Sequence, residues 1–299
     1  SFQAGPPRNE PSGPPKYYQP GRPGPHIDGI LYCASRRSTK GYPAVELAVQ
    51  QNLAPGATIA EKLLDIELCG YDAIELNYPG VIDDVPGVKA ALAGSPLHAR
   101  SMCLTPGHDL AVLDDDRAAR LSLFLRSLDL AADLGVETLV SVPVRGPLPE
   151  NMTEEEELDA YASALNVLGE AAEERGLRIV IEPLIRYETH LLNTLAQAAS
   201  TASRAGHPAI KILGVFFHMN VEEADIAASI RESSEWIGHV HLADSNRLNP
   251  GCGHLDFGPG LRALAEGGYD GVLALECRIA GELLAELRRS ADFIRRLWD

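Results

Sequence analysis

The sequence is poor in the features that mark several large classes of protein. It contains 26 lysines and arginines against 42 aspartates and glutamates, which gives a formal net charge of −16. This charge argues against a nucleic-acid partner and against adhesion to an anionic membrane, because both require a basic surface. No run of about 18 apolar residues is present that would span a bilayer. None of these absences excludes a small sugar as a substrate.

Cysteines are few and are not arranged in pairs. The five cysteines are odd in number, widely scattered and without a CxxC motif. This usage predicts a reduced, intracellular protein rather than one stabilised by disulfides. The N-terminus also lacks the apolar core of a signal peptide. Together these features predict a cytoplasmic protein.

Aliphatic side chains are nearly missing from the N-terminal 25 residues, which hold eight prolines and four glycines. Such a segment cannot bury enough apolar surface to offset the entropy lost on ordering. We therefore expect residues 1–29 to form a flexible, Pro/Gly-rich arm. Packing of this arm across a neighbouring subunit is the alternative.

From residue 30 onward, apolar strand-like runs alternate with amphipathic segments of helical period. The expected strands are 30–34, 73–77, 98–103, 138–142, 178–182, 211–217, 238–243 and 271–276. The expected helices are 44–52, 58–69, 84–93, 115–134, 153–175, 192–205, 221–233, 260–267 and 280–298. Eight strands alternating with helices over roughly 270 residues predict an α/β fold, a (β/α)8 TIM barrel, as one catalytic domain over residues 30–299.

Two of the expected strands end in a glutamate, Glu182 and Glu276. A carboxylate at the end of an apolar strand is costly unless it binds a metal or is paired. A parallel barrel gathers these strand ends on one face, with His241 between the two glutamates in strand order. A Glu/His/Glu set with open positions suits a divalent ion such as Mn²⁺, Co²⁺, Mg²⁺ or Zn²⁺. Structural ion pairs at the barrel rim are the alternative.

His239 and His241 are two residues apart on one strand and point to the same side. Only the outer one easily reaches the barrel mouth, so His239 is interpreted as a satisfied interior histidine. In the loops that follow the strands, Arg247 offers a planar donor fork to substrate hydroxyls. Glu188 is the expected substrate contact after the fifth strand. A surface arginine and a solvated carboxylate are the alternatives for these two residues.

These residues carry a family resemblance. From about residue 30 to its end, the chain resembles the xylose isomerase-like sugar isomerase/epimerase barrels, and within them the ketose 3-epimerases of the D-tagatose and D-allulose type. The motifs that carry the resemblance are IEP at 181–183, RYETHLLNT at 186–194, FHMNVEE at 217–223, HVHLADSNR at 239–247, PGCGHLDF at 250–257 and GYDGVLALEC at 268–277.

The resemblance implies a role for six residues of these motifs. It makes Glu182, His241 and Glu276 metal ligands, and it makes the two glutamates the acid–base pair acting on opposite faces of the sugar. The substrate-binding residues that it implies are Glu188, His218 and Arg247. One ligand of the family pattern is missing here: the motif expected as DTFHMN reads VFFHMN at 215–220, so Val215 stands where an aspartate is expected. His218 is the candidate substitute ligand, although a substrate contact is preferred for it.

The function that follows is a metal-dependent sugar isomerase or epimerase, with Mn²⁺ as the expected ion. Its glutamate pair would move a proton at the carbon next to the carbonyl of a ketose or keto-sugar. One alternative is a lyase of the keto-C-glycoside type, which would remove the same proton and then eliminate. A second alternative, favoured by Val215, is a non-catalytic sugar-binding barrel with a degraded metal site. The resemblance also implies a homodimer or tetramer.

Overall fold

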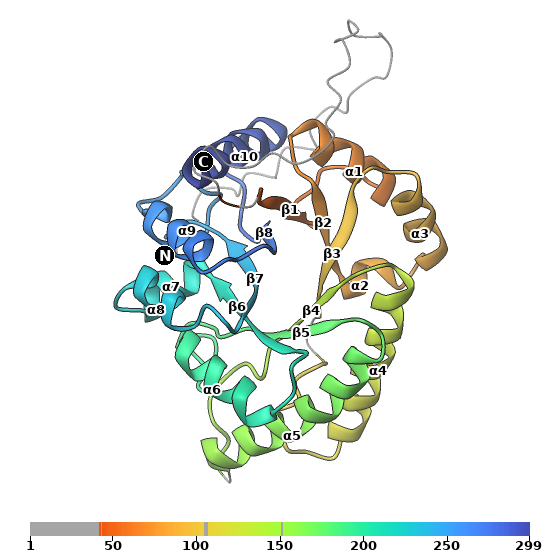
Figure 1. Cartoon of the computed structure of the whole chain (residues 1–299). Helices are drawn as coiled ribbons and strands as arrows, with labels where there is room; N and C mark the ends of the chain where they lie inside the picture. Colours follow the sequence, from red (N-terminus) through yellow and green to blue (C-terminus); the bar gives the residue numbers. More distant parts are fainter. Residues whose placement is uncertain (1–41, 43, 105–106, 151) are drawn as a thin grey trace, which may run out of the picture. The chain divides into compact units, whose positions relative to one another are not determined.

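Short apolar runs form the eight strands of a closed, parallel barrel (Figure 1). The computed structural model describes residues 42, 44–104, 107–150 and 152–299. Each strand pairs with its neighbours in sequence, and β8 pairs with β1 to close the sheet. The strands are β1 (Glu46–Gln50), β2 (Ala73–Asn77), β3 (His98–Cys103), β4 (Thr138–Ser141), β5 (Arg178–Ile181), β6 (Ile210–Val215), β7 (Ile237–Leu242) and β8 (Val272–Leu275).

Helices connect successive strands and surround the barrel (Figure 1). Their buried faces pack on the outside of the sheet in one large apolar core. In the described part of the chain they are α1 (Ile59–Leu68), α2 (Tyr78–Val81), α3 (Val85–Ala93), α4 (Arg117–Asp133), α5 (Glu154–Glu173), α6 (Leu195–Ala205), α7 (Phe216–Glu222), α8 (Ile226–Glu232), α9 (Phe257–Glu266) and α10 (Leu283–Trp298). The predicted (β/α)8 fold is confirmed. None of these helices combines the length and apolar character needed to cross a bilayer.

The start of the barrel differs from the prediction. Residues 44–52 were expected to form a helix, but Glu46–Gln50 is the first strand, paired with β2 and β8. Its residues Leu47, Ala48 and Val49 are all buried. A strand buried on both faces shows no alternation, so a run this short cannot be told from a helix by its periodicity. The segment 30–34 and the boundary near residue 30 lie outside the described residues.

The end of β6 also differs. The strand was expected to continue to residue 217, but it stops at Val215, and Phe216 begins α7. Phe216 turns away from the sheet and stacks on Phe257 of α9, with 5.2 Å between ring centroids. This long-range contact ends a strand that the apolar run alone would extend. As a result, His218 lies on a helix over the strand ends rather than in the loop that follows a longer strand.

The N-terminal ends of the strands carry ion pairs instead of a catalytic pattern. Arg100 on β3 pairs with Glu46 on β1 through Nε and Oε2, which lie 2.7 Å apart, and it also pairs with Glu137, next to β4. Charged pairs at this face of a barrel serve stability, whereas active sites lie at the C-terminal face. An active site is therefore expected at the C-terminal face of the barrel.

Candidate active site

Three of the predicted residues meet at the C-terminal face of the barrel. Glu182 directly follows β5, Glu276 directly follows β8, and His241 lies near the end of β7. One donor atom from each of the three lies within 4.8 Å of the other two. The structure therefore brings together the two glutamates and the histidine that the sequence singled out.

The sheet itself fixes the two glutamates. The Glu182 amide donates to the Ser141 carbonyl at 2.9 Å, and the Glu276 amide donates to the Leu242 carbonyl at 3.2 Å. These bonds extend the strand pairing by one residue, so both side chains leave the backbone from an ordered position. Glu182 is only 4% exposed and His241 is fully buried. Such groups need partners, because burial of an unpaired charge is costly.

The His241 ring presents one unsatisfied nitrogen to this group. Its Nδ1 lies 3.5 Å from Glu276 Oε2 and has no hydrogen-bond partner, although it is buried. Its Nε2 faces the opposite way, toward Glu75. Buried polar atoms without a partner are rare in folded proteins. An orphaned imidazole nitrogen beside two carboxylates is the donor arrangement that a divalent cation would complete, so the residues present fit the predicted metal.

The environment of Glu276 favours its charged form. Burial alone would raise its pKa, but the adjacent His241 and the positive charge of Arg247 hold the pKa below its ordinary value. Burial likewise would lower the pKa of His241, and the negative charge of Glu75 instead holds it well above the usual range. The site is thus a set of mutually compensating charges in a poorly solvated space.

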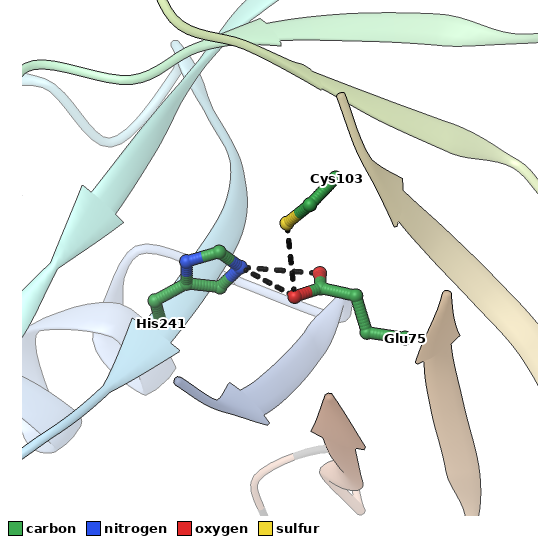
Figure 2. Close-up of side chains that lie close together, drawn as sticks. All are labelled: Glu75, Cys103 and His241. Carbon is green, nitrogen blue, oxygen red and sulfur yellow. Dashed lines mark hydrogen bonds and ion pairs between the residues drawn. The ribbon is translucent and has the colours of Figure 1, made fainter. Parts of the chain in front are cut away.

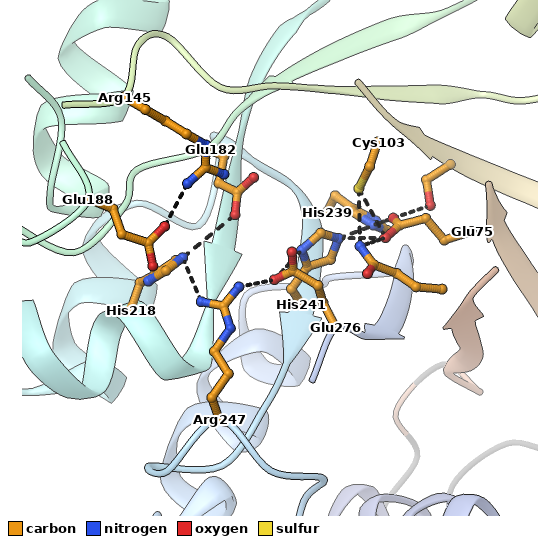
Figure 3. Close-up of polar contacts among 12 residues, drawn as sticks. Glu75, Cys103, Arg145, Glu182, Glu188, His218, His239, His241, Arg247 and Glu276 are labelled. Carbon is orange, nitrogen blue, oxygen red and sulfur yellow. Dashed lines mark hydrogen bonds and ion pairs between the residues drawn. The ribbon is translucent and has the colours of Figure 1, made fainter. Parts of the chain in front are cut away.

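Arg247 lies across the barrel mouth and joins two of the other residues. Its Nη2 is 3.1 Å from Glu276 Oε2, and its Nη1 is 3.3 Å from His218 Nε2. The guanidinium carbon also lies over the Phe217 ring, 4.8 Å from its centroid. Figure 3 shows Glu182, His218, Arg247 and Glu276 linked in a row. This row places donors and carboxylates side by side at the open end of the barrel.

The backbone of Arg247 is unusual. Its φ is +61°, the only positive φ of a non-glycine residue in the described ranges. The left-handed conformation costs about 1–2 kcal/mol for a residue with a Cβ, and such strain is typical of functional sites. The conformation is held by two hydrogen bonds: the Arg247 amide donates to the Asp244 carbonyl, and the Arg247 carbonyl accepts from Arg278, each at 2.8 Å.

Asp244 organises the same loop from its base. Its carboxylate accepts hydrogen bonds from the amides of Ser245 at 2.7 Å, Gly251 at 2.9 Å and Leu255 at 3.1 Å. Burial would raise the pKa of Asp244, but these backbone donors lower it. The Asp244 carboxylate therefore holds the predicted tight loop after the seventh strand, and this loop carries Arg247 at the barrel mouth.

His218 lies beside the glutamate pair without joining the cluster of donor atoms. It is buried on α7, with Nε2 3.7 Å from Glu182 Oε1. Because a guanidinium only donates, His218 Nε2 accepts from Arg247, and the buried Nδ1 is left without a partner. His218 therefore faces Glu182 and Arg247 through Nε2.

Glu188 lies further out, in the loop after β5. It pairs with Arg145 from the loop after β4, with 2.6 Å between Oε2 and Nη1 (Figure 3). Both side chains are about a third to a half exposed, at 34% and 48%. Arg145 was not predicted from the sequence. A lone arginine in a loop shows no pattern, and only the fold brings it to the mouth beside Glu188.

Val215 occupies the position where the family pattern has an aspartate. It is buried and aligns with His241 in the register of β6 and β7. Its side chain packs in an apolar cluster with Val140, Val180 and Leu213. The Glu/His/Glu group therefore borders an apolar cluster on the β6 side, and position 215 offers no metal-ligating atom.

One buried residue at the centre of the barrel was missed. Glu75 on β2 is fully buried and lies against His241 and Cys103 (Figure 2), and it also contacts His239. It shows the same sequence signal as Glu182, a lone glutamate in an apolar strand, and that signal could have found it. His239 is buried and bonded to this carboxylate at 2.7 Å, as expected for a satisfied interior histidine.

Comparisons with known proteins show which family the chain matches. The sequence model of the xylose isomerase-like TIM barrel family matches residues 64–297. 3-Dehydro-D-guloside 4-epimerase of Escherichia coli K12 is 31% identical over 244 residues, which cover 78% of this chain and 92% of that protein. L-Ribulose 3-epimerase of Mesorhizobium japonicum is 30% identical over 234 residues, covering 77% and 78%. These relatives are sugar epimerases, the class of enzyme that the sequence predicts.

Solved structures share the fold. The apo crystal structure of 3-keto-D-glucoside 4-epimerase from E. coli matches with a TM-score of 0.80 and 27% identity, covering 85% of this chain and all of that chain. D-Allulose 3-epimerase from Methylomonas sp., solved in complex with D-allulose, matches with a TM-score of 0.77 at 23% identity over 85% and 98%. The second likeness supports the fold alone.

The strained backbone and the side chain of Arg247 can be tested separately. Arg247→Ala and Arg247→Gly both remove the guanidinium, so we expect both to weaken sugar binding to the same extent. Only glycine relieves the left-handed strain, so Arg247→Gly should be more stable than Arg247→Ala by about 1 kcal/mol. Urea unfolding and substrate titration measure the two effects. Unchanged sugar affinity together with a large loss of stability would make Arg247 a structural residue.

Proposed function

The chain belongs to the xylose isomerase-like TIM barrel family, and from that premise we propose that it is a metal-dependent sugar epimerase. It would invert a carbon next to the carbonyl of a ketose or keto-glycoside. The observation that carries the proposal is the grouping of Glu182, His241 and Glu276 within 4.8 Å of one another at the strand ends. Two carboxylates that face one reacting carbon are the minimum equipment for inversion.

The substrate class follows from what the relatives share. A 3-dehydro-guloside carries its ketone next to C4, and L-ribulose carries its ketone next to C3. In both cases, the inverted carbon bears a hydrogen made acidic by the adjacent ketone. We therefore propose that the substrate is a keto-sugar, either free or glycosidic.

Glu182, Glu276 and Nδ1 of His241 would hold the divalent ion, which we propose to be Mn²⁺, with Co²⁺, Mg²⁺ and Zn²⁺ as alternatives. When bound, such an ion polarises a carbonyl and so makes the neighbouring C–H more acidic. Val215 contributes no ligand, so the site relies on three protein donors and leaves more positions open than a four-donor site would.

The chain's own residues would move the proton. One of the two glutamates removes it from the carbon, and the other returns a proton on the opposite face. Arg247 and His218 border this pair and present hydrogen-bonding atoms to the sugar oxygens, while Glu188 and its partner Arg145 border the outer part of the mouth. The ion pair of Arg247 with Glu276 also keeps that carboxylate oriented while it acts.

A non-catalytic sugar-binding barrel is the second candidate, because Val215 replaces a charged ligand. Against it stand the retained glutamate pair and the unpartnered Nδ1 of His241. We also propose that the protein assembles as a homodimer or tetramer and that it is located in the cytoplasm. The Pro/Gly-rich residues 1–29 are proposed as an arm outside the catalytic domain at residues 30–299.

The function is tested with Mn²⁺-loaded protein, free ketoses and 3-keto-glycosides in D₂O. We expect deuterium to enter at the carbon next to the ketone and a second epimer of equal mass, apart from the label, to appear. A lyase would instead give two fragments, which mass spectrometry separates from the epimer. Bound sugar without deuterium incorporation or product would support the non-catalytic barrel.

The glutamate pair is tested in the same assay. Glu182→Gln and Glu276→Gln should each reduce epimerisation by at least about 10²-fold, since each removes one of the two acid–base groups. Because glutamine is close to glutamate in size and shape, circular dichroism and the melting temperature of both variants should show an intact fold. Substantial turnover in either variant would exclude the two-carboxylate mechanism.

Val215 provides a test of the metal site that does not require turnover. Val215→Asp should tighten Mn²⁺ binding, because it adds an anionic donor next to His241. In chelator the same variant should melt at a lower temperature than the parent, since three carboxylates would then crowd a poorly solvated pocket. Val215→Asn is the matched control of equal size without the charge.

The readout is the rise in melting temperature when Mn²⁺ replaces chelator. Val215→Asp should show a larger rise than both the parent and Val215→Asn. Equal rises in all three proteins would mean that position 215 does not face the ion, and the proposed placement of the metal would be wrong.

A further inference from the structure

Glu75 is a charged group at the centre of the barrel, and the proposed proton transfer does not use it. It is fully buried on β2, where the register with β3 shifts by one residue between Ile74 and Glu75. In the adjacent strands its register partners are Gln50 and Ser101. Bulges of this kind re-aim side chains next to active sites. The carboxylate lies on the inner side of His241, opposite the glutamate pair (Figure 3).

Five side chains surround the Glu75 carboxylate. The contacts are Gln50 Nε2 to Oε1 at 2.9 Å, Cys103 Sγ to Oε1 at 3.2 Å, Ser101 Oγ to Oε2 at 2.6 Å, His239 Nε2 to Oε2 at 2.7 Å, and His241 Nε2 to Oε1 and Oε2 at 2.9 and 3.1 Å. Both carboxylate oxygens are therefore satisfied from several directions.

This network is complete without an ion. Glu75, Cys103 and His241 offer donor atoms within 4.8 Å of one another, a spacing that could also hold a metal (Figure 2). The carboxylate, however, already accepts from Gln50 and Ser101, and it is closed off from solvent. On this side of His241 every contact is a hydrogen bond already made, whereas the unsatisfied nitrogen is on the other side.

The contacts determine which imidazole nitrogen carries hydrogen. A carboxylate only accepts, so Nε2 of His241 donates to Glu75. When a cation displaces the other ring proton, Nε2 keeps its hydrogen on Glu75 and the lone pair of Nδ1 is directed toward Glu182 and Glu276. The buried Nδ1 lies 3.5 Å from Glu276 Oε2 and has no hydrogen-bond partner among the described residues, so this nitrogen is the one left for an ion.

We propose that Glu75 is a positioning residue, which holds His241 with its hydrogen on Nε2 and its Nδ1 directed at the divalent ion. The inference rests on the proposed metal site and extends it with a residue behind the ligand. A carboxylate that accepts from a ligating histidine fixes the orientation of the ring and makes it a better donor. Glu75 would thus act on the ion through His241, without contacting the ion or the sugar.

Two variants separate this role from a structural one. Glu75→Gln keeps the size but loses the charge and one acceptor, so the hold on Nε2 of His241 weakens. Ser101→Ala removes the 2.6 Å hydrogen bond to the same carboxylate and leaves His241 untouched. If the Glu75 carboxylate were merely structural, both variants would melt at a lower temperature than the parent, and both would bind the metal with the same affinity.

Metal affinity is measured by titrating the metal-free proteins with Mn²⁺ and following free Mn²⁺ by electron paramagnetic resonance. We expect Glu75→Gln to bind Mn²⁺ about 10- to 100-fold more weakly than the parent, and Ser101→Ala to bind it like the parent. Equal affinity of Glu75→Gln and the parent would overturn the positioning role while leaving the metal site in place. If the parent itself bound no ion, both the metal site and this inference would be overturned.

A second measurement does not depend on any variant folding. The parent labelled with ¹⁵N-histidine is loaded with diamagnetic Zn²⁺, and the imidazole nitrogens are assigned by NMR. We expect His241 to show a slowly exchanging proton on Nε2 and the shift of a metal-bound nitrogen at Nδ1. A proton on Nδ1 with Nε2 bound to the metal would place the ion on the Glu75 side and overturn the proposal.

Discussion

A carboxylate buried inside a closed barrel must be matched by donors, and Glu75 is matched by five. These donors come from β1, β3 and β7, so the charge ties together strands on opposite sides of the barrel. The pKa of Glu75 shows the balance: burial would raise it, but the nearby charge of His241 and the hydrogen bonds of His239 and His241 hold it well below its ordinary value. The orientation of His241, and with it the proposed metal site, depends on this pairing.

The outer half of the site is organised by a different charge. Asp244 anchors the loop after β7 through backbone amides, and this loop holds Arg247 in its left-handed conformation. Arg247 then connects His218 with Glu276 across the mouth.

Much of this arrangement could be predicted from the sequence. Seven of the eight barrel strands were identified, because apolar runs that end in polar residues mark the carboxyl ends of parallel strands. Those same ends held Glu182, His241 and Glu276, so the strand pattern identified three residues that the structure brings together. The helix expected at 44–52 was wrong, because this segment forms β1, whose buried residues Leu47, Ala48 and Val49 show no strand periodicity.

Other parts required the fold. Glu75 shows a sequence signal, but its five partners come from three other strands, and no local pattern reveals them. Arg145 reaches Glu188 only because two successive strand-end loops meet at the mouth. The turn at Phe216 depends on a contact with Phe257 in a distant helix. In each case, the missing information is a long-range contact rather than a local preference.

An ion held on the Nδ1 side of His241 is the central proposal, and anomalous diffraction would locate it most directly. Crystals of the parent protein grown with Mn²⁺ are measured above the manganese absorption edge. We predict a single anomalous peak among Glu182, Nδ1 of His241 and Glu276. No peak at that position, or a peak between Glu75, Cys103 and Nε2 of His241, would contradict the account.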